Sequence, residues 1–240
     1  MMKHIPNFIT SLNLAAGFFA IIYAANGDLV TASWLILAAM IFDFLDGFSA
    51  RLLKAYSAIG KELDSLADVV SFGVAPGLII YKILDDSLSL FGPMMSDSDS
   101  VKLTLILITP VLMPVCAALR LAIFNNDSTQ ATTFKGLPTP ANALAVISVV
   151  IAGHYSQSTL FSSFTGSPIL LIVFTVILSL MMVSRISLLS LKFSHLKVKG
   201  NEGRFILAGL VLISFAVFGI KAAPLIIPLY ILTSFLSLLF

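Results

Sequence analysis

The sequence predicts an all-α protein, a polytopic membrane helix bundle of about eight transmembrane helices with a cytoplasmic N-terminus. Of the 240 residues, 58% are hydrophobic and only 11% are charged, and the mean hydropathy is +1.04. Ordinary soluble domains are less apolar than this. Apolar stretches approaching the roughly 20 residues that cross a bilayer recur along the chain. We expect helices at 5–25, 29–53, 63–83, 103–124, 138–155, 168–191, 205–221 and 223–240.

Polar connections separate these stretches. The first two are joined by Asn-Gly-Asp at 26–28, a composition typical of a tight turn. Because Lys3 precedes the run at 5–25, that run also resembles a secretory signal, but regularly spaced polar residues within it favour a retained helix. Pro224 lies near the start of the last stretch, and the two final stretches are short for a full crossing unless they tilt.

The distribution of Lys and Arg predicts the orientation of the bundle. With a cytoplasmic N-terminus, only Lys82, Lys102 and Lys221 of the 14 basic residues lie outside. This excess of inner basic residues is typical of proteins with that topology. We therefore expect an integral protein of the cell inner membrane. The inner basic residues are Lys3, Arg51, Lys54, Lys61, Arg120, Lys135, Arg185, Lys192, Lys197, Lys199 and Arg204.

One stretch of this apolar sequence is rich in carboxylates. At helical spacing Asp43 and Asp46 share one face, and Asp64 and Asp68 share another. Gly60, together with Tyr56, Ser57 and Lys61 between the two pairs, predicts a polar turn that reverses the chain. The two acidic faces would then meet and form a four-carboxylate cage at the cytoplasmic end of the second and third helices.

Such a cage indicates a divalent cation. Unpaired carboxylates close together resist ionisation, whereas a divalent cation neutralises them. Oxygen ligands favour magnesium, manganese or calcium, and no His or Cys is near enough in sequence to suggest zinc. Magnesium usually also binds water and substrate phosphates, so we expect a phosphate-bearing ligand. Arg51 offers a cation for phosphate, and Gly47 and Ala50 leave room for a large ligand.

The pattern DxxDGxxARx8Gx3Dx3D, from Asp43 to Asp68, resembles the signature of the CDP-alcohol phosphatidyltransferase family. The segments IPNFITSLNLAAG, SFGVAP, RLAIFN and FKGLPTPANA are similar to the phosphatidylserine synthase branch of that family. One departure is Ile123, where a second basic residue is expected. The resemblance covers residues 3 to 155. We therefore expect a catalytic core at 1–155 and additional C-terminal transmembrane helices of the same membrane domain at 156–240.

The resemblance implies transfer of the phosphatidyl group from CDP-diacylglycerol to L-serine, giving phosphatidylserine and CMP. It implies two divalent cations, Mg²⁺ or Mn²⁺, with Asp43 and Asp64 on both and Asp46 on one. Asp68 would bind a metal and accept the proton of the acceptor hydroxyl as general base. The expected partners are the two substrates, membrane lipids and a second copy in a homodimer, with no nucleic acid.

Further residues are implied for the two substrates. Arg120, Asn125 and Lys135 could bind the carboxylate of serine, although residues that anchor an inner loop would look the same. The polar residues of the first helix could equally form interhelical hydrogen bonds. The residues expected to contact CDP-diacylglycerol are Gly47, Ala50, Arg51, Ser57, Asn7, Thr10 and Asn13.

Other functions are weaker alternatives. The same chemistry could use glycerol 3-phosphate or inositol phosphate as the acceptor, but a phosphorylated acceptor would favour more basic residues near the site. An ion-coupled transporter usually spreads polar or broken helices across the bundle and contains an internal duplication. A membrane scaffold would not need four aligned aspartates. The aspartates could instead be helix-end charges that pair with Arg51, Lys54 and Lys61 at the membrane interface.

Overall fold

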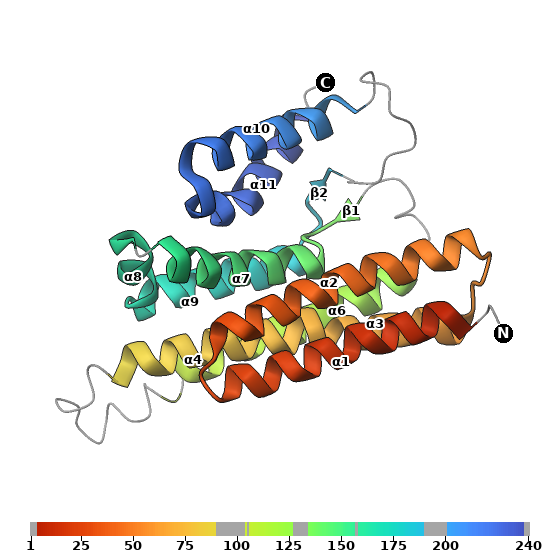
Figure 1. The fold of residues 1–240 in the computed structure, drawn as a ribbon, viewed down its shortest axis with the longest axis horizontal. Coiled ribbons are helices and arrows are strands. Elements are labelled where there is room, and N and C mark those ends of the chain that lie inside the picture. The colour runs from red at the N-terminus through yellow and green to blue at the C-terminus, as the bar shows by residue number, and fades with distance from the viewer. Residues whose placement is uncertain are drawn as a thin grey trace.

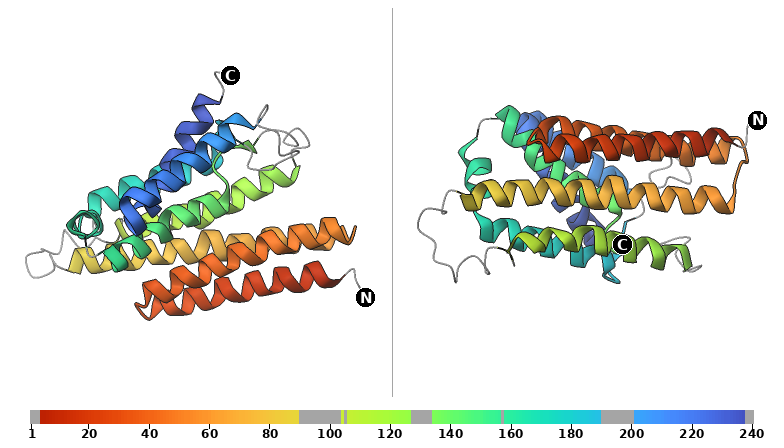
Figure 2. Two further views of the ribbon diagram at one scale, coloured as in Figure 1. Left: turned by 45° about the horizontal axis from the view of Figure 1, so that its top comes forward. Right: turned by 90° about the horizontal axis from the view of Figure 1, so that it is seen from below.

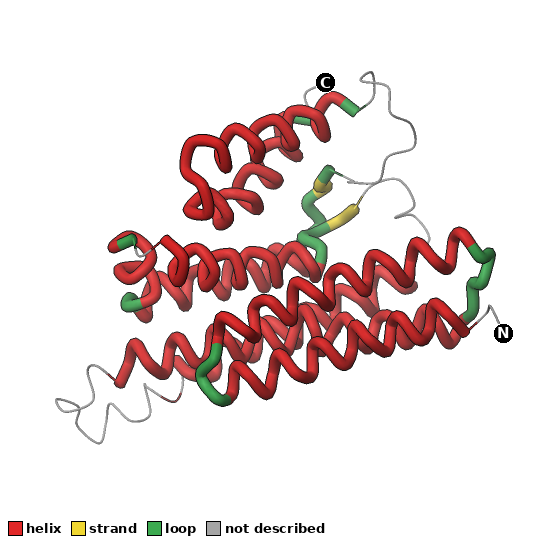
Figure 3. Tube along the Cα trace, viewed as in Figure 1, coloured by secondary structure: helices red, strands yellow, loops and turns green. Residues whose placement is uncertain are grey.

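The fold is a bundle of helices (Figure 3). A two-residue antiparallel strand pair, in which Phe134 faces Leu188 and Lys135 faces Ser187, is the one sheet among the described residues. The predicted all-α class is confirmed. The computed structural model describes residues 4–89, 104, 106–126, 134–156, 158–189 and 201–237.

Short connections join most of the elements. The helices are α1 (Ile5–Ala25), α2 (Leu29–Leu52), α3 (Ala58–Asp68), the π-helix η2 (Val69–Val74), α4 (Ala75–Ser89), the 3-10 helix η4 (Thr109–Val111), α6 (Leu112–Asn126), α7 (Thr139–Ser156), α8 (Thr159–Thr165), α9 (Pro168–Val183), α10 (Glu202–Phe218), the 3-10 helix η6 (Gly219–Leu225) and α11 (Ile226–Leu236). The strands are β1 (Phe134–Lys135) and β2 (Ser187–Leu188).

Several helices are long and apolar enough to cross a membrane. A sixth span results if α8 and α9, which bend by 79° at their junction, are counted together. The predicted count of eight crossings is not confirmed, since α7 forms where expected but is not among these spans. The five that qualify within the described residues are Ile5–Ala25, Leu29–Leu52, Ala58–Ser89, Ile106–Asn126 and Glu202–Leu236.

The last of these spans is not one straight helix. Gly219 ends α10 with a φ of 58°, a backbone conformation that glycine adopts readily. The chain then turns through η6, and α11 packs against α10 (Figure 1). The two final stretches expected from the sequence therefore form separate helices. The junction between them, Gly219–Leu225, begins before residue 222, where the sequence predicted the break, and it is longer than predicted.

The helices alternate in direction between two ends of the bundle. The N-terminus and the α2–α3 turn lie at one end, and the α1–α2 turn, the end of α4 and α8 lie at the other (Figure 1). α3, η2 and α4 form one long rod beside α1 and α2 (Figure 2). α7 and α9 form the next layer, and α10 with α11 lies outermost.

Small residues let α1 and α2 lie close together. These two helices form the most extensive contact in the bundle, and small side chains at an interface favour close packing of membrane helices. At the start of α2 the Asp28 carboxylate accepts a hydrogen bond of 3.0 Å from the Thr31 N–H, which lowers the pKa of Asp28. The buried alanines of the pair are Ala16, Ala20, Ala24, Ala32 and Ala39.

The turn between α2 and α3 lies at 53–57 rather than at Gly60. Lys54 adopts a φ of 50° in this turn, and the Ser57 hydroxyl accepts a 2.9 Å hydrogen bond from the Gly60 N–H, which begins α3. Gly60 lies inside the first turn of α3, where a Cβ would be 2.9 Å from Oδ1 of Asn7. The predicted reversal occurs, and Tyr56 and Ser57 lie in it as expected. The placement of Gly60 and Lys61 in the turn is wrong, since both lie in α3, where Gly60 lets α1 approach.

Gly17 allows α1 to lie against η2. A Cβ at Gly17 would be 2.2 Å from the Ser71 hydroxyl oxygen and 2.8 Å from the Ser71 Cα, so backbone would have to move. We expect Gly17→Ala to lower the free energy of unfolding by about 1–3 kcal/mol. Thermal unfolding in detergent measures this. Gly209→Ala is the control, because a Cβ there meets nothing within 4 Å; equal midpoints for the two variants would contradict the expectation.

Candidate active site

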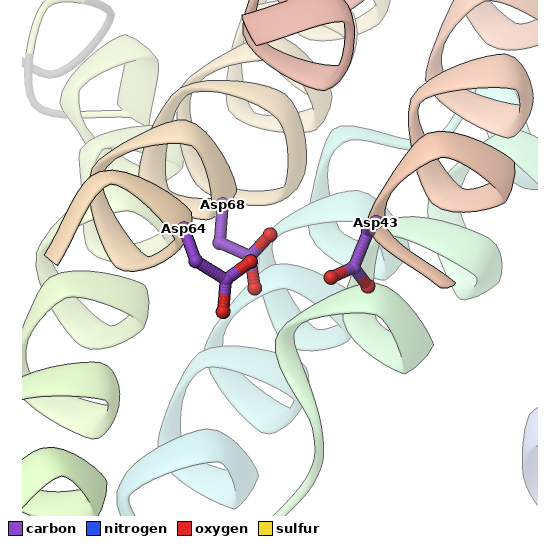
Figure 4. A group of neighbouring side chains, drawn as sticks. All are labelled: Asp43, Asp64 and Asp68. Carbon is purple, nitrogen blue, oxygen red and sulfur yellow. The ribbon is translucent and has the colours of Figure 1, made fainter. Parts of the chain in front are cut away.

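Three aspartates from two helices come together in the bundle. Asp43 comes from α2, while Asp64 and Asp68 lie one turn apart on α3 and face it (Figure 4). One carboxylate oxygen of each residue lies within 4.8 Å of the others. Asp68 is buried, and the other two are half-buried. The chain reversal after α2 therefore joins acids that are more than 20 residues apart in sequence.

Asp46 lies beside this group but is not part of it. Its Oδ2 accepts a 2.6 Å hydrogen bond from the Thr10 hydroxyl of α1. It remains close enough to Asp43, Asp64 and Asp68 to interact with them electrostatically. The four-carboxylate cage expected from the sequence is thus a three-carboxylate cluster with a fourth acid held by α1.

The polar face of α1 supports the acids. Asn13, which is fully buried, donates a 3.3 Å hydrogen bond from Nδ2 to Oδ1 of Asp68. Thr10 is also buried and bonds Asp46, while Asn7 is half-buried beside Gly60. The interhelical hydrogen bonds left open by the sequence are therefore present for Thr10 and Asn13.

Four of the residues expected to contact CDP-diacylglycerol lie near the C-terminal end of α2 and at the start of α3. Gly47 is exposed, and a Cβ there would meet nothing within 4 Å, so free space adjoins this face of α2. Ala50 is half-buried, and Arg51, one turn beyond Gly47, is exposed. Ser57 is exposed and caps α3.

Arg120 of α6 lies within electrostatic range of Asp68. The residue is buried, and its guanidinium lies 5.9 Å from the centre of the Phe124 ring. It is close enough to Asp68 and to Tyr230 of α11 to interact electrostatically with both. Its Nε has no hydrogen-bond partner within the part of the chain that the structure describes. Among the residues predicted for serine, Arg120 thus lies within electrostatic range of Asp68.

The other two predicted serine contacts have different surroundings. The Asn125 side chain donates a 2.8 Å hydrogen bond to the Ser65 hydroxyl. Its backbone carbonyl accepts one of 2.9 Å from the Lys61 ammonium. Asn125 thus ties the end of α6 to α3. Lys135 lies in β1, opposite Ser187 of β2.

The structure adds two residues that sequence reasoning missed. Asn142 of α7 is fully buried and donates to the backbone oxygen of Phe72, four residues after Asp68. Tyr230 lies near Arg120, although the C-terminal helices carried no motif that predicted a contact with the core. Asn142 does belong to the segment FKGLPTPANA, but its partner could not be inferred from one sequence.

The aspartate cluster could hold a divalent cation. Its ligand atoms are all carboxylate oxygens, which suit a hard divalent ion, and no His or Cys takes part in the group. Oδ1 of Asp64 is buried and has no hydrogen-bond partner among the described residues. Burying such an atom costs free energy unless something binds it. The donor atoms therefore fit the ion that the acidic pattern predicts.

A cavity of about 770 Å³ lies at the opposite end of the bundle, between the α1–α2 turn, α4, α7 and α8. Its lining includes Asp28, Asp86 and His154. Within the described part of the chain these groups do not bring their ligand atoms together. None of the predicted site residues lines this cavity.

The chain matches one protein-family model and several known proteins. The family model described as CDP-alcohol phosphatidyltransferase matches residues 3–179, which extends past the 3–155 of the sequence resemblance. The chain is 33% identical over 240 residues to the CDP-diacylglycerol--serine O-phosphatidyltransferase of Helicobacter pylori (strain J99), covering 98% of this chain and 91% of that protein. It is 34% identical over 201 residues to the enzyme of that name from Bacillus subtilis (strain 168), covering 84% and 96%.

A further relative is the archaetidylserine synthase of Methanothermobacter thermautotrophicus, 34% identical over 155 residues, which cover 64% of this chain and 60% of that protein. The family match includes the whole acidic stretch from Asp43 to Asp68 and the helices that position it. The chain belongs to the CDP-alcohol phosphatidyltransferase family.

Proposed function

We propose that this protein is an integral membrane phosphatidyltransferase that transfers the phosphatidyl group from CDP-diacylglycerol to L-serine, forming phosphatidylserine and CMP. The observation that carries the proposal is the cluster of Asp43, Asp64 and Asp68, whose oxygens lie within 4.8 Å of one another on two facing helices. The names of the relatives from Helicobacter pylori and Bacillus subtilis support CDP-diacylglycerol and serine as the substrates.

The aspartates and Arg51 would contribute to binding CDP-diacylglycerol in different ways. Asp43, Asp64 and Asp68 would hold one or two Mg²⁺ or Mn²⁺ ions, with Asp46 as a further ligand. When bound, these ions supply positive charge that stabilises the pyrophosphate as it is cleaved. Arg51 would bind phosphate from the open end of α2. The open space beside Gly47 leaves room for the nucleotide.

Asp68 is proposed as the general base. The serine hydroxyl oxygen forms a bond to the phosphorus that carries the diacylglycerol, and the bond from that phosphorus to the oxygen of CMP breaks. The hydroxyl proton passes to the Asp68 carboxylate, and CMP leaves with the bonding electrons. Asn13 donates to Oδ1 of Asp68, which fixes the orientation of this carboxylate.

Arg120 is proposed to bind the carboxylate of serine. Its guanidinium is buried near Asp68, and its unpartnered Nε offers a donor. A guanidinium and a carboxylate form strong, directional pairs. Lys135 and Asn125 would be further contacts, although the Asn125 side chain is already bonded to Ser65.

The proposal includes a location and an assembly. The excess of Lys and Arg in the segments around the α2–α3 turn supports a site that faces the cytoplasm from the cell inner membrane. A soluble acceptor such as serine could reach it there. A homodimer is the expected assembly, and the mass of the detergent-solubilised protein would test it.

We expect CMP release from CDP-diacylglycerol to require L-serine and to stop when EDTA removes divalent cations. Membranes that contain the protein are assayed with L-serine, glycerol 3-phosphate and inositol phosphate, each with and without EDTA. Membranes without the protein are the control. Added Mg²⁺ or Mn²⁺ should restore the rate after EDTA. Transfer only to glycerol 3-phosphate would contradict the choice of acceptor, and no transfer to any alcohol would contradict the proposed reaction.

A further inference from the structure

A π-helix follows Asp68 directly. α3, η2 and α4 form one helical segment of 32 residues, Ala58–Ser89, drawn as a long rod in Figure 2. The Ala75 N–H donates to the carbonyl of Val70, five residues earlier, which is the π-helical pattern. Such turns contain one residue more than an α-helix needs, and they occur often at functional sites.

The extra residue rotates α3 relative to α4 about the axis of the rod. Each residue of an α-helix turns the chain by about 100°. Beyond η2, α4 buries a face that includes Ile79, Ile80 and Leu84. Before η2, α3 directs Asp64 and Asp68 towards α2. With a regular α-helix in place of η2, the acids would be rotated by about 100° relative to the buried face of α4.

Neighbouring helices hold η2 in this form. Ser71, fully buried, donates a 3.1 Å hydrogen bond to the Asn13 carbonyl of α1. Asn142 of α7, also fully buried, donates a 3.3 Å hydrogen bond to the Phe72 carbonyl. A Cβ at Gly73 would lie 3.0 Å from the Ala117 Cβ of α6, so this third side is closely packed. Three helices therefore contact three successive residues of the π-helix.

One of these contacts leads directly to the site. The backbone carbonyl of Asn13 accepts from Ser71, while the side chain of Asn13 donates to Asp68. A shift of η2 relative to α1 would therefore change the geometry of the Asp68 carboxylate as well. On the other side, Asn142 supplies a donor to a carbonyl in the irregular turn. Side chains commonly satisfy backbone groups in this way when a membrane helix departs from regular geometry.

We propose that Ser71 and Asn142 are positioning residues, which hold the π-helix in register and so direct Asp64 and Asp68 towards Asp43. The inference rests on the proposed function, because it gives these two side chains a role in forming the cation site. It goes beyond the acidic motif, since both residues lie outside the stretch from Asp43 to Asp68.

The test compares Ser71→Ala and Asn142→Ala with two matched controls. Ser87→Ala and Ser148→Ala also remove buried hydroxyls, but those hydroxyls bond only to carbonyls of their own helices, at 2.8 Å and 2.9 Å. The affinity of the purified full-length protein for Mn²⁺, without substrate, is measured by electron paramagnetic resonance. We expect each test variant to bind Mn²⁺ about tenfold more weakly, as when supporting residues of a metal site are lost.

The rate of CMP release gives a second measurement. We expect the rate of the test variants to fall at low Mn²⁺ and to recover as the Mn²⁺ concentration rises, since the acids themselves are intact. The control variants should match the unsubstituted protein in both measurements. A general loss of packing would instead lower the thermal midpoint without changing the Mn²⁺ affinity of the remaining folded protein.

The outcomes separate this inference from the proposed function. Normal Mn²⁺ affinity in both test variants overturns the inference, while the proposed function stands if Asp43→Asn loses Mn²⁺ binding. Normal Mn²⁺ affinity in Asp43→Asn overturns the proposed cation site itself. If Asn142→Ala shows no cooperative unfolding, Ser71→Ala decides, because it removes only one hydroxyl: tenfold weaker binding supports the inference, and unchanged binding overturns it.

Discussion

Asp68→Asn is expected to reduce the rate of CMP release by about 10²–10⁴-fold, the usual contribution of a general base. The amide has nearly the same shape as the carboxylate but does not accept the hydroxyl proton of serine. Asp68 is buried, and Asn13 holds one of its oxygens, so water does not easily replace it as the base. The rate is measured in membrane vesicles at saturating CDP-diacylglycerol, serine and Mn²⁺.

Asp86→Asn is the matched control for this experiment. Asp86 lies on the same helical rod, 18 positions further on, which is about 27 Å along a helix. It should leave the rate unchanged. A normal rate in Asp68→Asn would contradict the proposed base, and an equal loss in both variants would indicate a general effect on the protein.

Asp43→Asn is expected to change stability in opposite directions with and without a divalent cation. Without the cation, three carboxylates with oxygens within 4.8 Å repel one another, so removing one charge should raise the thermal midpoint. With the cation, the unsubstituted protein should gain about 2.7 kcal/mol at a concentration 100 times its Kd. The variant should lose most of that gain, together with CMP release.

Thermal unfolding of the purified protein, with Mn²⁺ and with EDTA, measures both effects. Asp86→Asn is again suitable as the control, since it removes one exposed carboxylate outside the cluster. It should show the full stabilisation by Mn²⁺. An Asp43→Asn variant that Mn²⁺ still stabilises fully would contradict the proposed cation site.

The role of α1 explains how a membrane protein keeps so many acids in one place. Thr10 bonds Asp46 and Asn13 bonds Asp68, so α1 supplies a donor to an acid on each of the two facing helices. Gly17 and Gly60 let that helix approach closely enough to do so. Polar residues on a membrane helix often act in this way, and here they hold two of the four neighbouring acids.

Local patterns in the sequence were enough for the fold class and for much of the acidic site. The bounds of α1 agree with the predicted 5–25, and α2 ends one residue before the predicted 53. The spacing of Asp64 and Asp68 placed both on one face of a helix, as observed. These features depend on hydrophobic runs and on the period of the α-helix, which are properties of neighbouring residues.

Features that depend on contacts between distant segments were not predicted. The sequence did not indicate the pairing of Asp46 with Thr10, the π-helix after Asp68, or the proximity of Tyr230 to Arg120. Gly60 was assigned to a turn, because a glycine among polar residues looks the same whether it bends the chain or admits a neighbouring helix.

By itself, then, the sequence determined that this protein is a bundle of apolar helices carrying a precisely spaced set of aspartates. Only the tertiary structure decided that three of the four acids, Asp43, Asp64 and Asp68, form the cluster while Asp46 bonds α1. It also decided that Ser71 and Asn142 form hydrogen bonds between the π-helix and its neighbours. The reason is that helix formation follows from local periodicity, whereas the rotation and closeness of packed helices depend on side chains far apart in the chain.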